Sequence, residues 1–207
     1  SAQGVQVRNI RFQPKSGVTA AFIGNSEDIL FEYVDVLGGG SGISVEGSSN
    51  VFLRNFSVVG AMTNGVDLTD SYNTRVEYGT IWSNGAAQIA LSMKSNELVV
   101  VNHCIMGSFG LRKPIYRMAV GSNNLVANFN NLYLGNGALA ALATEKGFLR
   151  EYNSLGRWSV VSGQDSHSLS HLPQFANAGA GDVHLKSSAG RFDPAIGGYV
   201  TEDSANE

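Results

Sequence analysis

Two acidic residues and a later group of basic and aromatic residues supply this sequence's candidates for chemistry. Asp67 and Asp70 lie close together, and the second group comprises Arg112, Lys113, Tyr116 and Arg117. A carboxylate can act as a general base, and an arginine can neutralise the anion that forms when a proton leaves. The two groups lie far apart in the chain, so this chemistry requires a fold that brings them onto one surface.

The histidines and the cysteine have weaker claims. His167 and His171 have the i, i+4 spacing of zinc ligands on a helix, but Pro173 and a serine-rich context argue against a helix there, so we predict no metal site. The chain's one cysteine, Cys104, rules out an internal disulfide and is expected to be a buried small apolar residue. His103 is expected to be a structural turn residue.

A repeated pattern must position the candidate residues. Residues 42–53 (GISVEGSSNVFL), 65–76 (GVDLTDSYNTRV) and 88–99 (QIALSMKSNELV) share one pattern of apolar, polar and turn-forming residues. Their asparagines, Asn50, Asn73 and Asn96, recur at an interval of 23 residues. A period of this length is typical of stacked repeats rather than of a globule with one central core.

Alignment on these asparagines gives three columns of apolar residues. The columns are Ile23, Val45, Leu68 and Leu91; Phe31, Leu53, Val76, Val99 and Ala127; and Val36, Val58, Ile81, Cys104 and Leu132. Apolar residues alternate with polar ones around each column, which is typical of strands with one buried face. The pattern predicts an all-β solenoid of about five to six coils, with three strands per coil and parallel pairing between coils. The outward positions on the first strands are expected at Ser44, Asp67, Ala90 and Ala119.

The domain prediction is one β-helix domain over residues 1–207. Regular coils are expected over 1–134, a hairpin and short helix over 135–175, and a C-terminal closing segment over 176–207. The hairpin strands are expected at 138–143 and 148–152, and the helix between Ser154 and Gly163. Extra residues at 107–114 predict a projecting loop. The repeat begins at once after Ser1, and from this we expect a fragment of a longer chain.

Composition excludes some classes of partner. The chain has 14 basic and 17 acidic residues, a net charge of −3, which provides no general field for nucleic acid. No apolar run approaches the roughly 18 residues that span a bilayer. We therefore expect neither nucleic-acid binding nor membrane insertion.

Residues 65–76 and 100–105 (VVNHCI) resemble the repeats of right-handed parallel β-helix proteins of the pectate-lyase-like superfamily, of the bacterial secreted or surface type. Residues 152–185 are similar to the closing region of such proteins. The resemblance implies a right-handed parallel β-helix, a secreted or cell-surface location, and a groove along the outer face of the first strands. It also implies an internal asparagine ladder, for which Asn55, Asn102 and Asn130 are the candidates.

In such a groove, the resemblance implies that the chain binds or processes polysaccharide as a lyase, hydrolase or epimerase. Asp67 and Arg117 would be the catalytic pair of an elimination, and the substrate would be bound by Asp70, Arg112, Lys113 and Tyr116. The carboxylate motifs of polygalacturonases are absent, because Met62, Thr63, Asn64 and Gly65 stand where the first would be. No cofactor is identified, although a calcium ion beside Asp67 would also support a lyase.

Whether the chain is an enzyme stays open. The alternative is a non-catalytic structural or adhesive segment of a larger surface protein. Its partners would then be other segments of a longer chain, or another copy bound through the coil ends. Exposed aromatics are an open candidate for a sugar-stacking platform: Tyr33, Tyr72, Tyr78, Trp82, Phe109 and Tyr116.

Overall fold

The computed structural model describes residues 2–82, 89–119, 121–122, 124–135, 137–145, 148–186, 192–193 and 197–199. The chain divides into two compact units, Ser1–His171 and Leu172–Glu207. We expected one domain with a closing segment from residue 176, and the boundary between the units falls a few residues earlier. Gln88, the first residue of the predicted repeat 88–99, lies outside the described residues.

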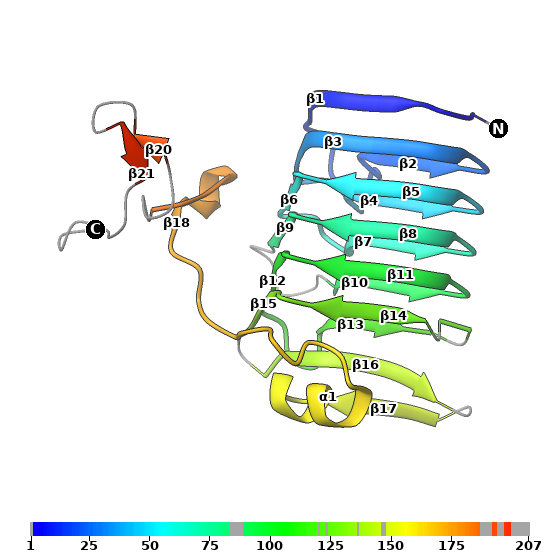
Figure 1. Cartoon of the computed structure of the whole chain (residues 1–207), viewed down its shortest axis with the longest axis vertical. Coiled ribbons are helices and arrows are strands. Elements are labelled where there is room, and N and C mark those ends of the chain that lie inside the picture. The colour runs from blue at the N-terminus through cyan, green and yellow to red at the C-terminus, as the bar shows by residue number, and fades with distance from the viewer. Residues whose placement is uncertain are drawn as a thin grey trace. The chain divides into compact units, whose positions relative to one another are not determined.

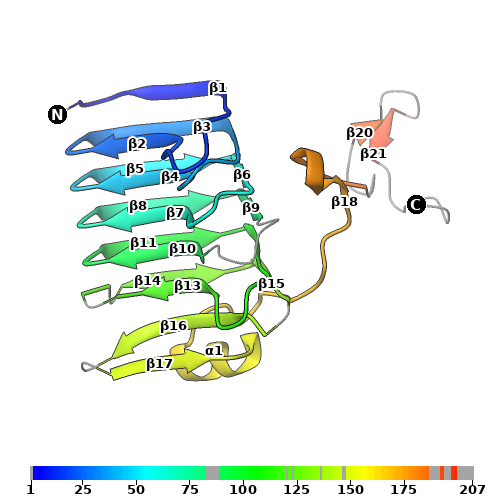
Figure 2. The same cartoon turned by 180° about the vertical axis from the view of Figure 1, so that it is seen from behind.

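The first unit is a solenoid of parallel strands (Figures 1 and 2). One sheet contains β2 (Ala21–Gly24), β4 (Ile43–Glu46), β7 (Asn64–Thr69), β10 (Ile89–Lys94), β13 (Pro114–Met118), β16 (Leu139–Glu145) and β17 (Phe148–Tyr152). A second contains β1 (Gln6–Phe12), β3 (Glu27–Leu37), β5 (Ser49–Arg54), β8 (Tyr72–Glu77), β11 (Glu97–Asn102) and β14 (Leu125–Asn128). The long β3 bends into a third stack with β6 (Ser57–Val59), β9 (Thr80–Trp82), β12 (Ile105–Ser108) and β15 (Asn131–Leu134). The predicted three strands per coil are confirmed.

The described residues of the second unit form two short antiparallel pairs. β18 (Phe175–Asn177) pairs with β19 (Asp182–Leu185) around the 3₁₀ helix η1 (Ala178–Ala180), and β20 (Phe192–Asp193) pairs with β21 (Gly198–Tyr199). Asn177 caps η1 by accepting a hydrogen bond from the Ala180 N–H (3.2 Å).

In each coil, one residue in the left-handed conformation makes the corner between the second and third stacks. These corner residues have φ between 50° and 56°, and they are Asn9, Tyr33, Asn55, Tyr78, His103 and Phe129. Asparagine tolerates this conformation, whereas it costs energy for tyrosine and phenylalanine. The turn is short because one such residue redirects the strand.

The apolar columns form the interior, with a register that differs from the prediction in one coil. The columns are Ile23, Val45, Leu68, Met93 and Met118; Phe31, Leu53, Val76, Val101 and Ala127; and Val36, Val58, Ile81, Met106 and Leu132. The predicted members Leu91, Val99 and Cys104 were each wrong by two residues. Because Val101 pairs with Val76, that repeat is 25 residues long rather than 23. A slip of two keeps the same face inward, so the three misplaced residues are still buried.

The prediction that Asn55, Asn102 and Asn130 form an internal asparagine ladder is wrong, because the three residues lie in different environments. Asn55 makes a corner, Asn102 ends β11, and Asn130 lies in the interior, where its Oδ1 accepts a hydrogen bond from the Cys104 N–H (2.9 Å). A half-buried ladder instead joins two of the repeating asparagines, Asn50 and Asn73. Asn73 donates to the Asn50 side chain (2.8 Å), which donates to Asp28 (2.9 Å).

The predicted hairpin and helix are confirmed, and they close one end of the coils. β16 extends the first sheet in parallel with β13, and β17 returns antiparallel. Helix α1 (Leu155–Ser162) begins after Ser154, whose hydroxyl accepts from the Arg157 N–H, and ends at Gly163 in a left-handed conformation (φ 74°). No helix among the described residues combines the length and apolar character needed to cross a bilayer.

The segment after α1 lies against the last coil and holds a buried carboxylate. The Asp165 N–H donates to the Ala127 carbonyl (2.7 Å), and Leu169 bridges to Asn131. The Asp165 side chain accepts hydrogen bonds from Trp158 Nε1 (3.0 Å), Asn130 Nδ2 (2.9 Å) and the Ser168 hydroxyl (2.7 Å). These bonds fasten the closing elements to the coils.

We expect the free energy of unfolding to fall as the pH rises above about 9, because of Cys104. Burial raises the pKa of this thiol from 9.0 to about 12. The unfolded chain therefore loses this proton before the folded chain does, and stability that is intact below pH about 9 declines by about 1.4 kcal/mol per pH unit up to about 12. Urea unfolding at pH 8 and pH 10 measures this slope. The slope should be shallower in Cys104→Ala, and equal slopes in the two proteins would contradict the expectation.

Candidate functional site

Parallel pairing places one row of outward side chains along the first sheet. This outer row comprises Phe22, Ser44, Asp67, Ser92 and Arg117, which are direct register partners in β2, β4, β7, β10 and β13. At about 4.8 Å per coil, the row is about 19 Å long. It therefore offers a regular, linear set of contacts to an extended ligand.

The register correction changes two members of this row. We expected Ala90 and Ala119 at the outward positions, whereas Ser92 and Arg117 pair in line with Asp67. The row is consequently more polar than predicted. Asp67 and Arg117, the proposed catalytic pair, do lie in one row, with Ser92 between them.

A second outward row lies beside the first and shows a charge separation along the sheet. It contains Glu46, Thr69 and Lys94 at register positions two residues beyond Ser44, Asp67 and Ser92. Asp70 follows in the exposed turn after β7 with φ 48°. Acidic side chains thus lie on β4 and β7, and basic side chains lie on β10 and β13.

Arg112 and Lys113 lie in the turn that precedes β13. The Arg112 side chain is exposed and forms an ion pair with Glu151 on β17. Lys113 is half-buried, and its carbonyl accepts hydrogen bonds from the Ser108 hydroxyl and the Leu139 N–H (3.0 Å each). Glu151 pairs with Leu142, which in turn pairs with Arg117. Glu151 therefore follows in register beyond Arg117, and its ion pair with Arg112 places an acidic and a basic side chain near that end of the outer row.

Tyr116 does not belong to this surface, which corrects its predicted place among the substrate-binding residues. β13 begins at Pro114, so Tyr116 pairs with Leu91 and points inward, where its side chain is fully buried. Burial raises the pKa of its phenol well above the usual value. Its ring packs near Trp158 (centroids 5.9 Å apart), as part of the interior.

Phe22 is a residue of the row that the sequence reasoning missed. Its side chain is 64% exposed, and the Cβ atom of any larger residue at position 24 would lie about 2.5 Å from its ring. The ring therefore covers Gly24 on the sheet surface and leaves its other face open. The alternation of Ala21 and Ile23 with Phe22 was the signal that could have revealed this outward position.

Other aromatics form a stacked column at the corner turns. Tyr78, His103, Phe129 and His167 stack in succession with centroid separations of 4.9, 5.5 and 5.3 Å and interplanar angles of 10° to 20°. Their faces cover one another, so they leave mainly ring edges to solvent. Trp82 is buried and packs with Phe109 and Tyr133. Neither group presents the row of open ring faces that a sugar platform needs.

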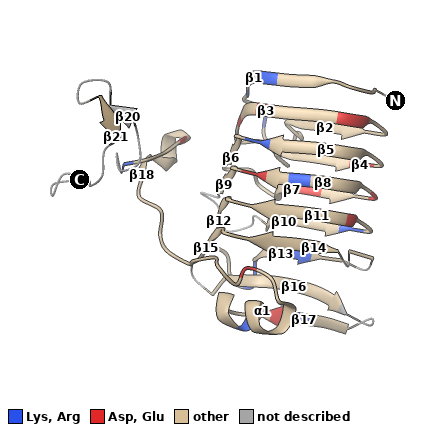
Figure 3. Cartoon of the chain, in the orientation of Figure 1, with Lys and Arg blue, Asp and Glu red and all other residues tan. Residues whose placement is uncertain are grey.

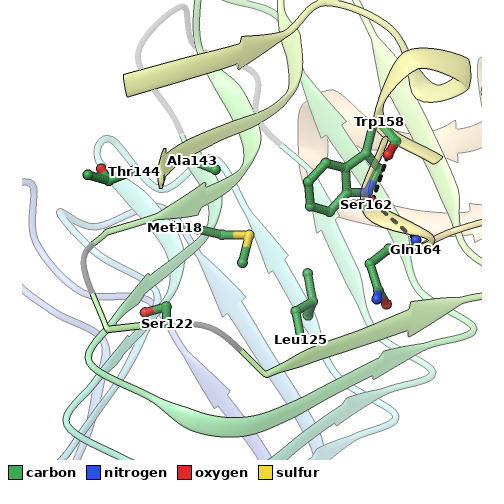
Figure 4. A pocket seen from close by; sticks show the side chains of 8 residues that line it. All are labelled: Met118, Ser122, Leu125, Ala143, Thr144, Trp158, Ser162 and Gln164. Carbon is green, nitrogen blue, oxygen red and sulfur yellow. Dashed lines mark hydrogen bonds between the residues drawn. The ribbon is translucent and has the colours of Figure 1, made fainter. Parts of the chain in front are cut away.

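A hollow near α1 has a different character (Figure 4). Its lining comes from β13, β14, β16, α1 and the adjoining turns: Met118, Ser122, Leu125, Ala143, Thr144, Trp158, Ser162 and Gln164. The Ala127 N–H donates a hydrogen bond to Gln164 Oε1 (2.8 Å), which fixes the position of this side chain. None of these eight side chains titrates, so the hollow offers no acid–base chemistry.

Metal-binding side chains do not gather in the described part of the chain. No group of three or more His, Cys, Asp or Glu residues there is placed to hold an ion. His167 stacks on Phe129, and the His171 N–H donates to Asn131, in a segment that is not helical.

Comparison with known proteins gives a family but no named relative. No curated protein and no solved structure matches the chain. The model of the right-handed β-helix region matches residues 1–149, which contain the whole outer row. Together with the parallel coils, this match shows that the chain belongs to the family of right-handed β-helix regions.

Proposed function

We propose that this chain is a carbohydrate-binding module that holds an extended, carboxylate-bearing polysaccharide along the outer row. We further propose that it is of the pectate-lyase-like type and acts outside the cell or at its surface, as its repeats resemble those of such proteins. The observation that carries the proposal is the register that aligns Phe22, Asp67 and Arg117 on one face.

Side chains of the outer row, together with Lys94 of the second row beside it, have chemical roles in this proposal. Phe22 offers an open ring face to a sugar ring. Lys94 and Arg117 supply charge-assisted hydrogen bonds to uronate carboxylates. Asp67 accepts hydrogen bonds from sugar hydroxyls, and Ser92 can both accept from and donate to them. The sheet is rigid, so these groups are already in place before the ligand binds, which reduces the entropic cost of binding.

Elimination by Asp67 and Arg117 is the second candidate function, since the two residues share a row. Their backbones are two coils apart, about 9.6 Å. A base and its neutralising cation must act on the same sugar, which requires the Arg117 side chain to reach back past Ser92. This separation favours binding over turnover.

We expect the chain to bind polygalacturonate, alginate or an acidic glycosaminoglycan more tightly than neutral dextran in isothermal titration. Arg117→Ala should weaken binding about tenfold, through the loss of charge-assisted hydrogen bonds. Phe22→Ala should weaken it about fivefold, through the loss of stacking. Assays for unsaturated and reducing ends, with and without calcium, are run in parallel to detect cleavage of the same polymers.

Two matched variants on the second sheet serve as controls. Arg75→Ala removes an exposed arginine, and Tyr72→Ala removes a 53% exposed aromatic, and neither should change binding. Turnover that Asp67→Ala abolishes would establish the second candidate. Absence of binding to every acidic polymer would overturn the proposal in favour of a structural or adhesive segment.

A further inference from the structure

The corner between the second and third stacks carries a column of aromatic side chains that one coil interrupts. The corner residues of successive coils follow one another in register, and they are Asn9, Tyr33, Asn55, Tyr78, His103 and Phe129. From Tyr78 to Phe129 every coil contributes a ring, and these rings stack nearly parallel. Asn55 lies between two tyrosines and has only a short amide side chain. The column therefore lacks one ring, and we call the space between Tyr33 and Tyr78 beside Asn55 the ring slot.

The two tyrosines on either side of the ring slot have the same setting. Both are corner residues, with φ of 55° for Tyr33 and 52° for Tyr78, and each is 56% exposed. Tyr78 stacks on His103 on one side (centroids 4.9 Å apart, interplanar angle 10°), so its opposite face is turned toward the coil of Asn55. Tyr33 lies two coils from Tyr78, about 9.6 Å. A planar ring halfway between them would lie about 4.8 Å from each, which is within the range of stacked aromatic pairs.

Charges beside the ring slot favour a cation. The charged residues within two positions of the corner in these three coils are Glu32, Asp35, Arg54 and Glu77. The acidic ones belong to β3 and β8 (Figure 3). Arg54 donates to Glu32 (2.7 Å), whereas Asp35 and Glu77 form longer ion pairs with other arginines, at 3.4 and 3.7 Å. The faces of the two phenol rings are also negative, so a planar cation between them is favoured over a neutral ring.

We propose that the ring slot binds a planar aromatic cation of the pyridinium type, stacked between Tyr33 and Tyr78. The column already contains an arrangement of this kind, because the imidazole of His103 lies nearly parallel to the rings of Tyr78 and Phe129 on its two sides. The half-buried Asn55 adds an amide that can donate or accept a hydrogen bond beside the bound ring. The ring slot is separate from the outer row, which lies on the first sheet.

Three probes of similar size separate the effect of charge from that of planarity. N-methylpyridinium is a planar cation, pyridine is a neutral planar ring at neutral pH, and N,N-dimethylpiperidinium is a cation without an aromatic ring. Each is titrated against the full chain and followed by the NMR signals of the probe. N-methylpyridinium should bind with a Kd of roughly 1 mM, with its ring protons shifted upfield by the tyrosine rings. The other two probes should bind about fivefold more weakly.

Exchanges between residue types that the corner already contains provide matched variants. Tyr33→Asn and Tyr78→Asn each remove one wall of the ring slot and should weaken N-methylpyridinium binding about fivefold. Asn55→Tyr fills the slot with a ring of the chain itself and should abolish binding while the charge is unchanged. Both residue types adopt the left-handed conformation at this corner, so the variants should fold, which circular dichroism verifies. Tyr72→Asn removes a 53% exposed tyrosine from the second sheet and should leave binding unchanged.

Three results would overturn the proposal. Equal binding of the three probes, or tighter binding of pyridine, would show that the ring slot does not select a planar cation. Unchanged binding of N-methylpyridinium to Asn55→Tyr would place the cation on another acidic surface. A chain that gives no saturable shift with N-methylpyridinium would show that the two tyrosines do not hold a ring between them.

Discussion

Replacing Leu53 by alanine is expected to lower the free energy of unfolding by about 2 to 5 kcal/mol. The Leu53 side chain is completely buried between its register partners Phe31 and Val76 in the adjacent coils. Truncation removes transfer free energy and leaves a cavity, because the backbone ladders on either side limit how far the coils can collapse. Urea denaturation followed by circular dichroism measures the loss.

Leu149→Ala is the matched control for this prediction. It makes the same chemical change on β17, where the Leu149 side chain is 61% exposed. Such a surface change is expected to alter stability by no more than about 0.5 kcal/mol. Similar losses in the two variants would show that the apolar columns do not form the stabilising interior.

Replacing Asp165 by alanine is expected to lower the free energy of unfolding by about 3 to 5 kcal/mol. The change leaves Trp158 Nε1, Asn130 Nδ2 and the Ser168 hydroxyl without their acceptor in a buried site, and each unsatisfied donor costs about 1 to 3 kcal/mol before the structure relaxes. Because these bonds join α1 to the last coil, the tryptophan emission should also shift toward the red. Denaturation and fluorescence spectra measure the two effects.

Asp67→Ala is the control for the loss of Asp165. Asp67 is a half-buried carboxylate on the outer face of the first sheet, and its loss should leave stability within about 0.5 kcal/mol of the original chain. An Asp165→Ala protein as stable as Asp67→Ala would mean that the buried network does not hold the closing elements in place.

The sequence predicted the solenoid because its signals repeat. Each coil places aliphatic residues in the same columns, so an error in one coil does not change the fold. The alignment on the repeating asparagines produced one such error. In the structure Glu97 is the register partner of Tyr72. Asn96 therefore aligns with Ser71 and not, as predicted, with Asn73. The hairpin and α1 were also predictable, since Ser154 and Gly163 are local signals that do not depend on register.

The candidate site was less predictable because it depends on register between distant segments. The prediction placed a projecting loop at 107–114 and Ala119 at an outward position of the following first strand, so Tyr116 was expected on the outer surface. In the structure β13 begins at Pro114, which turns Tyr116 inward and puts Arg117 in line with Asp67. Only the backbone pairing of β10 with β13 fixes these positions, and no local sequence signal encodes it.

We propose that the outer row is a linear binding surface, and the dependence of affinity on ligand length tests this proposal most directly. Acidic oligosaccharides of increasing length, titrated against the full chain, should gain affinity until they extend over the row of about 19 Å and then reach a plateau. Arg117→Ala and Phe22→Ala should each bring the plateau to shorter ligands, because each removes one end of the row. Affinity that is independent of length, or unchanged in both variants, would contradict the account.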